Sequence, residues 1–496
     1  MDKILYKSTR GDGSCITSSQ AILKGLSDDG GLFVPENIPA LDIPLSDLAK
    51  MDYKGVAFEV MSRFFSDFNA AELKYCIENA YDKKFDTDEI APLVKKGGVY
   101  FLELFHGATI AFKDMALSIL PYLMTVSAKK NNIKNDIVIL TATSGDTGKA
   151  ALSGFADVPH TKIIVFYPKG GVSHIQELQM VTQKGENTFV CGVKGNFDDC
   201  QSAVKKMFND PALKEELLKG GYQFSSANSI NIGRLIPQVA YYVWAYSRLV
   251  ADGEIKAGDK INFVVPTGNF GNILAGYYAK LMGLPVNMFI CASNENKVLY
   301  DFFESGVYDI NRPFILTSSP SMDILISSNL ERLIYKIEGC SEKENKRLME
   351  DLAKKGRYEI SEKAMENLKD FTGGFATEEE NFAGIKSLYE KEGYVTDTHT
   401  GIAYSVYKDY LRKTGDNTPC IIVSTASPYK FSKAVLGAID EKYKDKDDLE
   451  LIYELKEVSG RPLPDAMKDI LKAEIRHDTV CALSGLEAEV KGFLNL

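Results

Sequence analysis

The sequence predicts an α/β protein built on a mainly parallel sheet. From about residue 98, short apolar runs rich in β-branched residues alternate with stretches of helical periodicity, as they do in βαβ units. Two of these runs are followed by glycine-rich loops that lead into helical segments. The length of 496 residues exceeds what one hydrophobic core usually fills and indicates two or three domains.

Five apolar runs are predicted to form the strands. They cover residues 136–143, 162–168, 188–195, 260–268 and 286–293. The segments between them, such as TGKAALSGFAD and FDDCQSAVKKMFND, have apolar positions at helical spacing. Because parallel sheets bind ligands beyond the carboxyl ends of their strands, we expect the functional residues in the loops that follow these runs.

Residues 1–97 predict a small, mostly helical N-terminal domain. Helical patterns run from Ser18 to Gly25, from Ser46 and from Asn69, and the last two begin on residues that commonly cap helices. Residues 98–496 form the larger region with the predicted strands. Within it, residues 342–395 are amphipathic and rich in lysine and glutamate, so we expect a helical insertion over about 330–395.

Composition and charge restrict the class of function. The net charge of -10 and the pI near 5.3 argue against nucleic-acid binding, which needs a cluster of basic residues on the surface. No apolar run approaches the roughly 18 residues of a membrane span, and residues 1–20 lack a signal-peptide pattern. The eight cysteines include no CxxC pair and no zinc-like spacing with the five histidines. We expect a cytoplasmic protein without metal, membrane or nucleic-acid partners.

A lysine stands at the start of a strongly apolar segment in HGATIAFKDMALSILPYLM, residues 106–124. A solvated lysine has a pKa of about 10.4, and burial can lower it by up to ~3–5 units. Lys113 would then be a nucleophilic or Schiff-base amine. The alternative, which this stretch alone favours, is a charged lysine that pairs with Asp114 and extends its amine toward solvent.

The loop PTGNFGN, residues 266–272, follows one predicted strand and precedes an apolar helical segment. A glycine-rich loop in this position turns backbone N–H groups toward an anion, so we expect it to bind a phosphate. It matches neither GxxxxGK[ST] nor GxGxxG, which argues against nucleotide and dinucleotide sites. An ordinary turn between strand and helix is the alternative.

A second loop of the same kind is TATSGDTGKAA, residues 141–151. Its hydroxyls and exposed amides suit a carboxylate or a second phosphate. The candidate residues are Ser144, Gly145, Asp146 and Thr147. Asp146 acting only as a helix N-cap is the alternative.

A polar cluster precedes an aromatic helical stretch in SSANSINIGRLIPQ, residues 225–238. Asn228 and Asn231 can donate and accept hydrogen bonds, and Arg234 can bind a phosphate or carboxylate through two N–H groups. The alternative is polar capping with a surface arginine.

These features fit together as a site for pyridoxal phosphate. Lys113 would form the Schiff base, one loop would hold the cofactor phosphate, and the other would hold a substrate carboxylate. No single feature makes this case alone, since each has a structural alternative.

The same residues resemble the threonine synthase family of fold-type II pyridoxal-phosphate enzymes. The resemblance rests on STRG, AILKGLSDDGGLFVPE, HGATIAFKD, ATSGDTGKAA, SSANSINIGRLIPQ, PTGNFGNILAGYYAK and STASPYKF, which follow the family's order along nearly the whole chain. It implies two open, mainly parallel sheets flanked by helices. Residues 1–97 would be the N-terminal threonine-synthase domain, and residues 98–496 would be the cofactor-binding catalytic region with two α/β subdomains.

The resemblance also implies roles for individual residues. Lys113 matches the Schiff-base lysine, and Thr425 matches the hydroxyl residue near the pyridine nitrogen. The phosphate loop matches Gly268, Asn269, Phe270, Gly271 and Asn272. The substrate cleft matches Ser144, Gly145, Asp146, Thr147, Asn228, Asn231 and Arg234. The chain departs from the family at Ser427-Pro428-Tyr429, where His-Pro-Ala is frequent.

The implied reaction converts O-phospho-L-homoserine and water to L-threonine and phosphate, the last step of threonine biosynthesis. The alternatives are a serine/threonine dehydratase-like lyase, which would need no site for a γ-phosphate, and a catalytically idle homologue that retains the cofactor. We expect a monomer or a homodimer.

Overall fold

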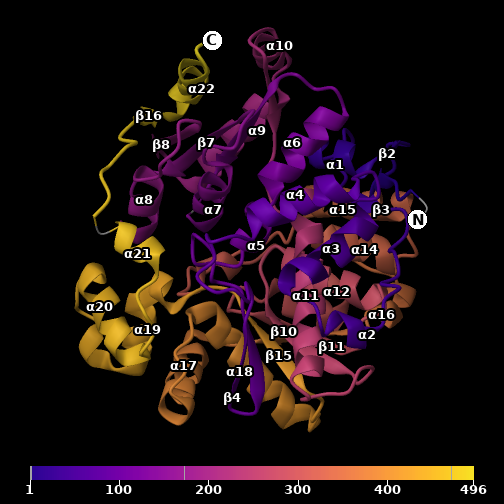
Figure 1. Cartoon of the computed structure of the whole chain (residues 1–496), viewed down its shortest axis with the longest axis vertical. Helices are drawn as coiled ribbons and strands as arrows, with labels where there is room; N and C mark the ends of the chain where they lie inside the picture. The colour runs from indigo at the N-terminus through magenta and orange to yellow at the C-terminus, as the bar shows by residue number, and fades with distance from the viewer. Residues whose placement is uncertain (1–2, 144, 173, 471) are drawn as a thin grey trace.

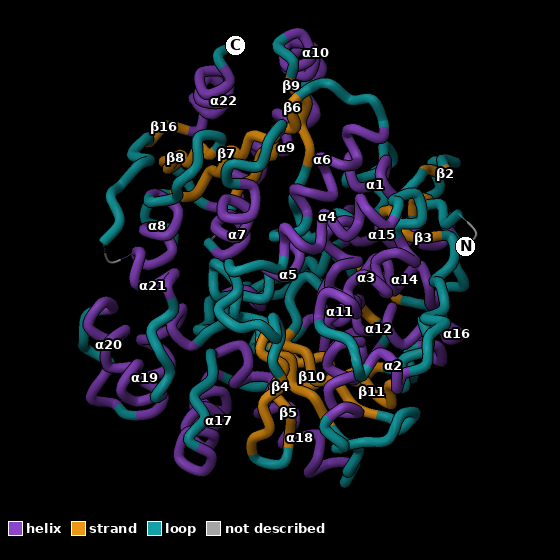
Figure 2. The backbone as a smooth tube through the Cα atoms, in the orientation of Figure 1, coloured by secondary structure: helices purple, strands orange, loops and turns teal. Residues whose placement is uncertain are grey.

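The computed structural model describes residues 3–143, 145–172, 174–470 and 472–496. Their strands gather mainly in two large sheets that lie apart from each other, each surrounded by helices (Figures 1 and 2). One sheet has five strands in the order β16-β8-β7-β6-β9, and the other has six in the order β14-β11-β10-β15-β5-β4. Two open sheets flanked by helices confirm the fold class expected from the sequence.

The five-stranded sheet is parallel throughout. Its strands are β6 (Asp136–Ala142), β7 (Thr161–Pro168), β8 (Thr188–Lys194), β9 (Tyr222–Ser225) and β16 (Val480–Ala482). Its helices are α7 (Asp146–Phe155), α8 (His174–Val181), α9 (Phe197–Asn209), α10 (Pro211–Lys219) and α22 (Leu486–Leu494). Helix α6 (Leu120–Lys130), which precedes β6, packs mainly against helices of the N-terminal unit. Residues near the C-terminus thus complete a sheet that begins at residue 136, and β16 and α22 lie at this end of Figure 1.

The six-stranded sheet is parallel except for β4, which runs antiparallel to β5. Its strands are β4 (Leu93–Lys96), β5 (Val99–Glu103), β10 (Ile261–Pro266), β11 (Val286–Ser293), β14 (Phe371–Phe375) and β15 (Cys420–Ser424). Its helices are α5 (Asp114–Leu117), α11 (Ile232–Ala251), α12 (Gly271–Leu281), α13 (Val298–Ser305), α17 (Glu378–Glu392) and α18 (Thr398–Thr414). The long helix α11 is buried along most of its length and packs against α12. Helices over both faces explain the continuous apolar runs of these strands.

The N-terminal unit contains the predicted helices and also a small sheet that the sequence did not indicate. Its helices are α1 (Ser18–Lys24), α2 (Leu45–Leu48), α3 (Tyr53–Phe64) and α4 (Ala70–Ala80), and its antiparallel strands are β1 (Tyr6–Ser8), β2 (Cys15–Ile16) and β3 (Phe33–Pro35). The helix predicted from Ser46 is two helices, because Asp52 caps α3 by accepting a hydrogen bond from the N–H of Gly55. The small sheet escaped prediction because its strands have only two or three residues.

The segment at 330–395 is not the purely helical insertion that we expected. Besides helices α14 (Leu330–Ile337), α15 (Glu342–Lys355), α16 (Glu362–Asn367) and α17, it contains β13 (Arg357–Glu359) and β14. Strand β14, with the sequence FTGGF, pairs in parallel with β11 and forms an edge of the six-stranded sheet. A Cβ atom on Gly374 would lie 2.4 Å from Val406 Cγ1, so the glycine permits α18 to pack closely. Glycine in a strand weakened the strand pattern in the sequence.

The remaining elements connect the two sheets or cover them. They are β12 (Val307–Asp309), η1 (Pro320–Met322), η2 (Pro428–Phe431), α19 (Ser432–Ile439), η3 (Glu441–Tyr443), α20 (Asp448–Ser459), α21 (Asp465–Ile470) and η4 (Leu483–Gly485). Helices α19 and α20 pack together beside α17, on the side of the molecule opposite the N-terminal unit (Figure 1). Within the described ranges, no helix is both long and apolar enough to cross a membrane.

Candidate active site

Lys113 stands immediately before α5, on a loop that is tied to the end of β15. The N–H of Phe112 donates to the carbonyl oxygen of Thr425 at 2.8 Å, and Ala111 forms an isolated antiparallel bridge with Ala426. These backbone contacts join HGATIAFKD to STASPYKF, although more than 300 residues separate the two motifs. Lys113 and Thr425 are therefore held at the carboxyl end of the six-stranded sheet, where parallel sheets bind ligands.

The amine of Lys113 is enclosed by residues from several elements. Its Nζ atom lies 3.3 Å from Ser321 Oγ and 3.7 Å from Asp146 Oδ2. Burial is the main cause that lowers the pKa of Lys113; the charges of Lys430 and Arg234 lower it further, whereas Asp146 opposes the shift. A lowered pKa favours the free amine that a nucleophilic lysine needs.

Asp114 does not serve as the ion-pair partner of Lys113. Its carboxylate is buried and accepts hydrogen bonds from the backbone N–H of Thr109 at 2.7 Å and from the Thr109 hydroxyl at 2.5 Å. Burial raises the pKa of Asp114. The charged lysine paired with Asp114, which the sequence left open, is therefore not what the structure contains.

The loop before α7 places Asp146 opposite Lys113. Thr143 Oγ1 accepts hydrogen bonds from the N–H groups of Gly145 and Gly148, both at 3.0 Å, which fixes the turn. Gly145 is the N-cap residue with a φ of 139°, and a Cβ there would lie 2.4 Å from Gln176 Nε2. Asp146 is the first helical residue and not the N-cap. Thr147 lies in the first turn of α7, and Ser144 lies outside the described residues.

Asp146 is a buried carboxylate between two lysines. Its Oδ1 atom lies 2.9 Å from Lys430 Nζ and accepts a hydrogen bond from Gln176 Nε2 at 3.1 Å. Although burial raises the pKa of Asp146, the charges of Lys430 and Lys113 outweigh that effect and hold it far below its usual value. Asp146 is thus ionised at neutral pH, as the counter-ion of two amines.

The loop between β10 and α12 makes a tight turn before the helix begins. Phe270 adopts a left-handed conformation with a φ of 63°, and Gly268 has no room for a side chain because a Cβ would lie 2.3 Å from the carbonyl oxygen of Ser321. Asn329 donates from its N–H and its Nδ2 atom to the carbonyl oxygen of Asn269, both at 3.1 Å. The segment with Ser321 and Asn329 thus braces the loop from outside.

Asn272, at the start of α12, carries a buried donor. Its Oδ1 atom accepts hydrogen bonds from the hydroxyls of Tyr241 at 2.6 Å and Tyr242 at 2.7 Å. Its Nδ2 atom is buried and has no hydrogen-bond partner among the residues that the structure describes. A buried donor without a partner costs about 1–3 kcal/mol, so this atom is poised to bind a ligand's acceptor.

Arg234, in the first turn of α11, is buried and close enough to Lys113 to influence its pKa. Its Nη1 atom donates to the carbonyl oxygen of Ala227 at 3.0 Å, whereas Nε is buried without a partner in the described part of the chain. Burial lowers the pKa of Arg234 to about 10, so the guanidinium is still charged at neutral pH. This arrangement does not match a surface arginine.

The two asparagines of the same cluster differ from Arg234. Asn231 is fully buried, accepts from the N–H of Gly233, and donates to the carbonyl oxygens of Ile22 and Ser226 at 2.9 and 3.0 Å. Its side chain caps α11 and joins it to α1. Asn228 is exposed, and the hydrogen bonds recorded for it are made by its backbone. Their contact with substrate stays a prediction.

Three groups at the site, Ser321, Lys430 and His399, were not among the residues chosen from the sequence. Lys430 follows Ser427-Pro428-Tyr429 and is part of the STASPYKF motif. Its place in that motif was the feature of the sequence that could have identified it as a site residue. His399 was missed completely: its Nδ1 atom lies 2.7 Å from Asp397 Oδ2, and its Nε2 atom accepts from the N–H of Ser321 at 3.1 Å. His399 thus supports the segment that contacts Lys113.

Ser427-Pro428-Tyr429, where the threonine synthase pattern frequently has His-Pro-Ala, has a structural role in this chain. Ser427 caps η2 by accepting a hydrogen bond from the N–H of Tyr429, and the hydroxyl of Tyr429 donates to the carbonyl oxygen of Arg461 at 2.7 Å. Tyr429 packs in an apolar cluster with Val435, Leu436 and other residues of the C-terminal helices. It therefore anchors the C-terminal helices beside the site.

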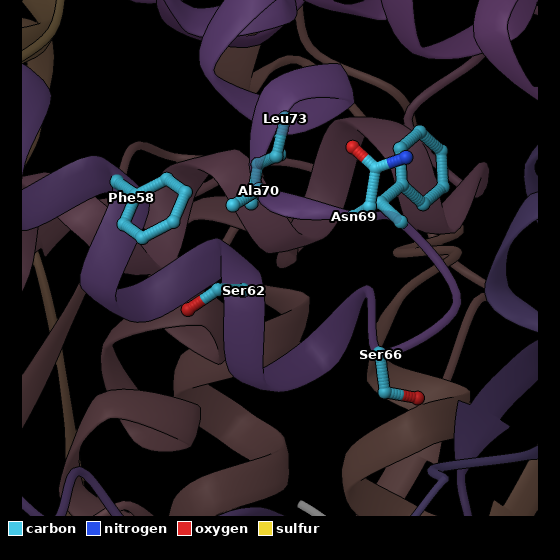
Figure 3. A pocket seen from close by; sticks show the side chains of 7 residues that line it. Phe58, Ser62, Ser66, Asn69, Ala70 and Leu73 are labelled. Carbon is cyan, nitrogen blue, oxygen red and sulfur yellow. The ribbon is translucent and has the colours of Figure 1, made fainter.

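A surface hollow of about 330 Å³ lies elsewhere, in the N-terminal unit between α3 and α4 (Figure 3). It is lined by Phe58, Ser62, Ser66, Phe68, Asn69, Ala70 and Leu73. None of the residues around Lys113 lines it. We therefore place the site by its buried polar groups and not by the size of a hollow.

Comparison with known proteins agrees with this geometry. Residues 5–81 match the family described as threonine synthase N terminus, residues 86–425 match pyridoxal-phosphate dependent enzymes, and residues 400–490 match the threonine synthase C-terminal family. A threonine synthase of Schizosaccharomyces pombe is 36% identical over 96% of this chain and 99% of its own length. The chain belongs to the threonine synthase family.

Two further threonine synthase relatives show how far the likeness extends. The crystal structure of a threonine synthase from Brucella melitensis, described as bound to pyridoxal phosphate, has a TM-score of 0.88, 35% identity and coverage of 99% of this chain and 100% of that one. Human threonine synthase-like 1 is 39% identical over 94% of this chain, but the chain spans only 64% of that protein's length. The family resemblance and the pyridoxal-phosphate class inferred from the sequence are confirmed.

Proposed function

We propose that this protein is a threonine synthase, which converts O-phospho-L-homoserine and water to L-threonine and phosphate. The observation that carries the proposal is the largely buried amine of Lys113, whose side chain is 11% exposed, faces Asp146 and lies within electrostatic range of Arg234. Family membership over nearly the whole chain supports it. The assignment of the other residues to cofactor or substrate is part of the proposal.

The residues of the site fit pyridoxal phosphate. Lys113 would bind its aldehyde, and the backbone of residues 268–272 would bind its phosphate. The unpaired donor of Asn272 would meet an acceptor of the cofactor. Thr425, which is buried at the end of β15, would place its hydroxyl near the ring nitrogen. When bound, the cofactor supplies an electron-withdrawing ring that spreads negative charge formed on the substrate carbons.

The reaction requires several proton transfers close to one another. Protons must leave Cα and Cβ, phosphate must leave Cγ, water must add at Cβ, and protons must return to Cγ and Cα. We assign proton transfer at Cα to Lys113 Nζ, because burial favours its free amine form. Asp146 stays ionised and stabilises the ammonium form after Lys113 has accepted a proton.

Expulsion of phosphate requires positive charge at the leaving group. Arg234 is charged, buried, and has an Nε–H that finds no acceptor among the described residues. An arginine in this state binds phosphate oxygens with little reorganisation, and such stabilisation is often the largest contribution to catalysis. Thr147, in the first turn of α7, would provide a backbone N–H group for the second anionic group of the substrate, whereas the N–H of Gly145 already donates to Thr143 Oγ1.

The decisive experiment incubates the purified, cofactor-loaded protein with O-phospho-L-homoserine and assays phosphate and threonine together. Equal amounts of both products are expected. Phosphate with 2-oxobutyrate and no threonine would identify a lyase of the dehydratase kind, and neither product would identify an idle homologue. The cytoplasmic location and the monomeric or homodimeric state stay predictions.

A further inference from the structure

Lys430 is the most deeply buried lysine near Lys113, and the proposed reaction assigns it no role. Its side chain is 1% exposed, and its Nζ atom lies 2.9 Å from Asp146 Oδ1 and donates to the carbonyl oxygen of Thr109 at 3.2 Å. Thr109 belongs to the loop that carries Lys113, and Asp146 begins α7. Lys430 is thus fixed between the loop of Lys113 and the carboxylate that faces Lys113.

The two oxygens of Asp146 are used differently. Oδ1 has two close donors, Lys430 and Gln176, at 2.9 and 3.1 Å. Oδ2 faces Lys113 at 3.7 Å, which is longer than an ordinary charge-assisted hydrogen bond of about 2.7–2.9 Å. The carboxylate is therefore neutralised mainly by Lys430, and Lys113 is its more distant partner.

This difference matters because a close, unshared carboxylate would keep a proton on Lys113. Attachment of the cofactor joins the lysine nitrogen to the aldehyde carbon and releases the aldehyde oxygen as water with the two amine hydrogens, so it begins from the unprotonated amine. We propose that Lys430 is a positioning residue for Lys113: by holding Asp146 Oδ1, it prevents that carboxylate from becoming the sole counter-ion of Lys113 and leaves Lys113 as a free amine.

The charged groups around Lys113 agree with this role. Arg234, on α11, and Lys430, before α19, both disfavour a proton on Lys113, whereas the charge of Asp146 favours it. Asp114 is held by Thr109 and has a raised pKa, and His399 is separated from Lys113 by Ser321. Removal of Lys430 would leave Asp146 with Lys113 as its remaining cation within 4 Å in the described structure.

The test measures how cofactor attachment depends on pH. The full-length protein is freed of cofactor, mixed with pyridoxal phosphate at a series of pH values, quenched with borohydride, and scored by mass for the pyridoxyl group on the Lys113 peptide. Lys430→Met keeps most of the length of the side chain without its charge. In this variant the midpoint of the pH profile should rise by about one unit, so that at pH values below the midpoint the fraction of Lys113 present as free amine falls roughly tenfold. Lys430→Arg should stay close to the wild type.

A second pair of variants separates this effect from misfolding. Asp146→Asn removes the group that holds the proton, so its midpoint should fall below that of the wild type, and Lys430→Met combined with Asp146→Asn should lose the upward shift. Lys280→Met is the matched control: Lys280 pairs with Asp370 at 2.8 Å near the end of α12 that is remote from the phosphate loop, and its loss should leave the midpoint unchanged.

Two outcomes would overturn the inference. One is a folded Lys430→Met variant with the wild-type midpoint, and the other is an Asp146→Asn midpoint equal to or above that of the wild type. The inference depends on the cofactor assignment in the proposed function and not on its substrate. A wild-type protein that attaches the cofactor at Lys113 but forms no threonine would refute the proposed function and leave this inference standing.

Discussion

Tyr242 fixes the orientation of the Asn272 side chain. Its hydroxyl donates to Asn272 Oδ1 at 2.7 Å, and the hydroxyl of Tyr241 approaches the same oxygen at 2.6 Å. Because hydroxyl donors occupy the oxygen of the amide, the Nδ2 donor must point away from them. In the described residues that donor has no acceptor, so the two tyrosines of α11 determine which end of the amide is free for a ligand.

Tyr242→Phe should weaken cofactor binding without unfolding the protein. One lost hydrogen bond is worth about 1 kcal/mol, so the Kd for pyridoxal phosphate should rise roughly fivefold in a spectroscopic titration. Tyr246→Phe is the matched control, since Tyr246 lies on the same helix but donates to the carbonyl oxygen of Asp259. An equal loss of affinity in both variants would attribute the effect to α11 as a whole.

Lys113→Ala should abolish covalent attachment of the cofactor and lower threonine formation by roughly 10²–10⁴-fold or more, the usual contribution of a general acid–base group. Borohydride treatment followed by peptide mass mapping should find the pyridoxyl group on Lys113 in the wild type and on no lysine of the variant. Labelling of another lysine in the wild type would contradict the assignment, and circular dichroism of the variant checks its fold.

Arg234→Ala should lower kcat/KM for O-phospho-L-homoserine by roughly 10²–10³-fold, because the leaving phosphate loses a preorganised cation. Arg234→Lys should fall between the wild type and the alanine variant, since an ammonium keeps the charge but not the two-pronged geometry. Arg248→Ala serves as the control: Arg248 lies on the same helix and donates to the carbonyl oxygen of Ala49 at 2.6 Å. Phosphate release that is unaffected by Arg234→Ala would remove Arg234 from the leaving-group site.

The sequence was sufficient where one local pattern determines the structure. The strands at 162–168 and 286–293 are found within one residue of their predicted bounds, because continuous apolar runs between turns favour buried parallel strands. Lys113 became a candidate only through its combination with the two glycine-rich loops and the polar cluster, because the stretch around it alone favoured an ordinary charged lysine. Strand β14 was not predicted, because its glycines carry no β pattern and its position depends on pairing with β11.

The partners of the site residues could not be predicted, because they come from distant segments. Lys430 meets Asp146 across 284 positions, and His399 meets Ser321 across 78. Asn231 shows the opposite problem: its sequence context suggested a ligand contact, but its amide is occupied by the backbone of α1 and α11. Which polar side chains remain free for a ligand is decided by tertiary packing, which one sequence does not report.

Asn329 connects the loop of residues 268–272 to the N-terminal unit. It donates to the carbonyl oxygen of Asn269, and its Oδ1 atom accepts from Arg332, which also donates to the carbonyl oxygen of Phe33 at 2.9 Å. Arg332 is fully buried, and its guanidinium donates to both Phe33 and Asn329. The N-terminal unit is thereby joined to the loop proposed to bind the cofactor phosphate.

Asn329→Ala should therefore raise the Kd for pyridoxal phosphate by about tenfold, from the loss of one or two hydrogen bonds that hold the loop. Asn345→Ala is the control, because Asn345 is an equally buried asparagine that donates to the carbonyl oxygen of Thr9 and to Glu331 and does not contact the loop. Both variants should lose stability in thermal unfolding. Only Asn329→Ala should change the Kd. An equal rise of the Kd in Asn345→Ala would show that loosening of the N-terminal unit is enough to weaken cofactor binding, without a direct contact to the loop.

A charge network around His106, formed with the buried Glu103 and the half-exposed Asp86, should make stability fall at alkaline pH. His106 Nε2 lies 3.0 Å from Glu103 Oε2, and Nδ1 lies 2.5 Å from Asp86 Oδ1. Although burial lowers its pKa, hydrogen bonds to Asp86 and Glu103 raise it from 6.5 to about 9. A pKa that is higher in the folded state stabilises the fold fully below pH 6.5, and the contribution is lost as the pH rises through 9. The shift corresponds to on the order of 3 kcal/mol.

The measurement is the free energy of unfolding from urea titrations between pH 6 and 10, for the wild type and for His106→Gln. The difference between the two proteins should be largest near pH 6 and should shrink toward pH 9–10, because the variant cannot bind the proton. His160→Gln is the control, since His160 is mostly exposed beside Asp136. A difference that does not vary with pH would mean that folding does not shift the pKa of His106.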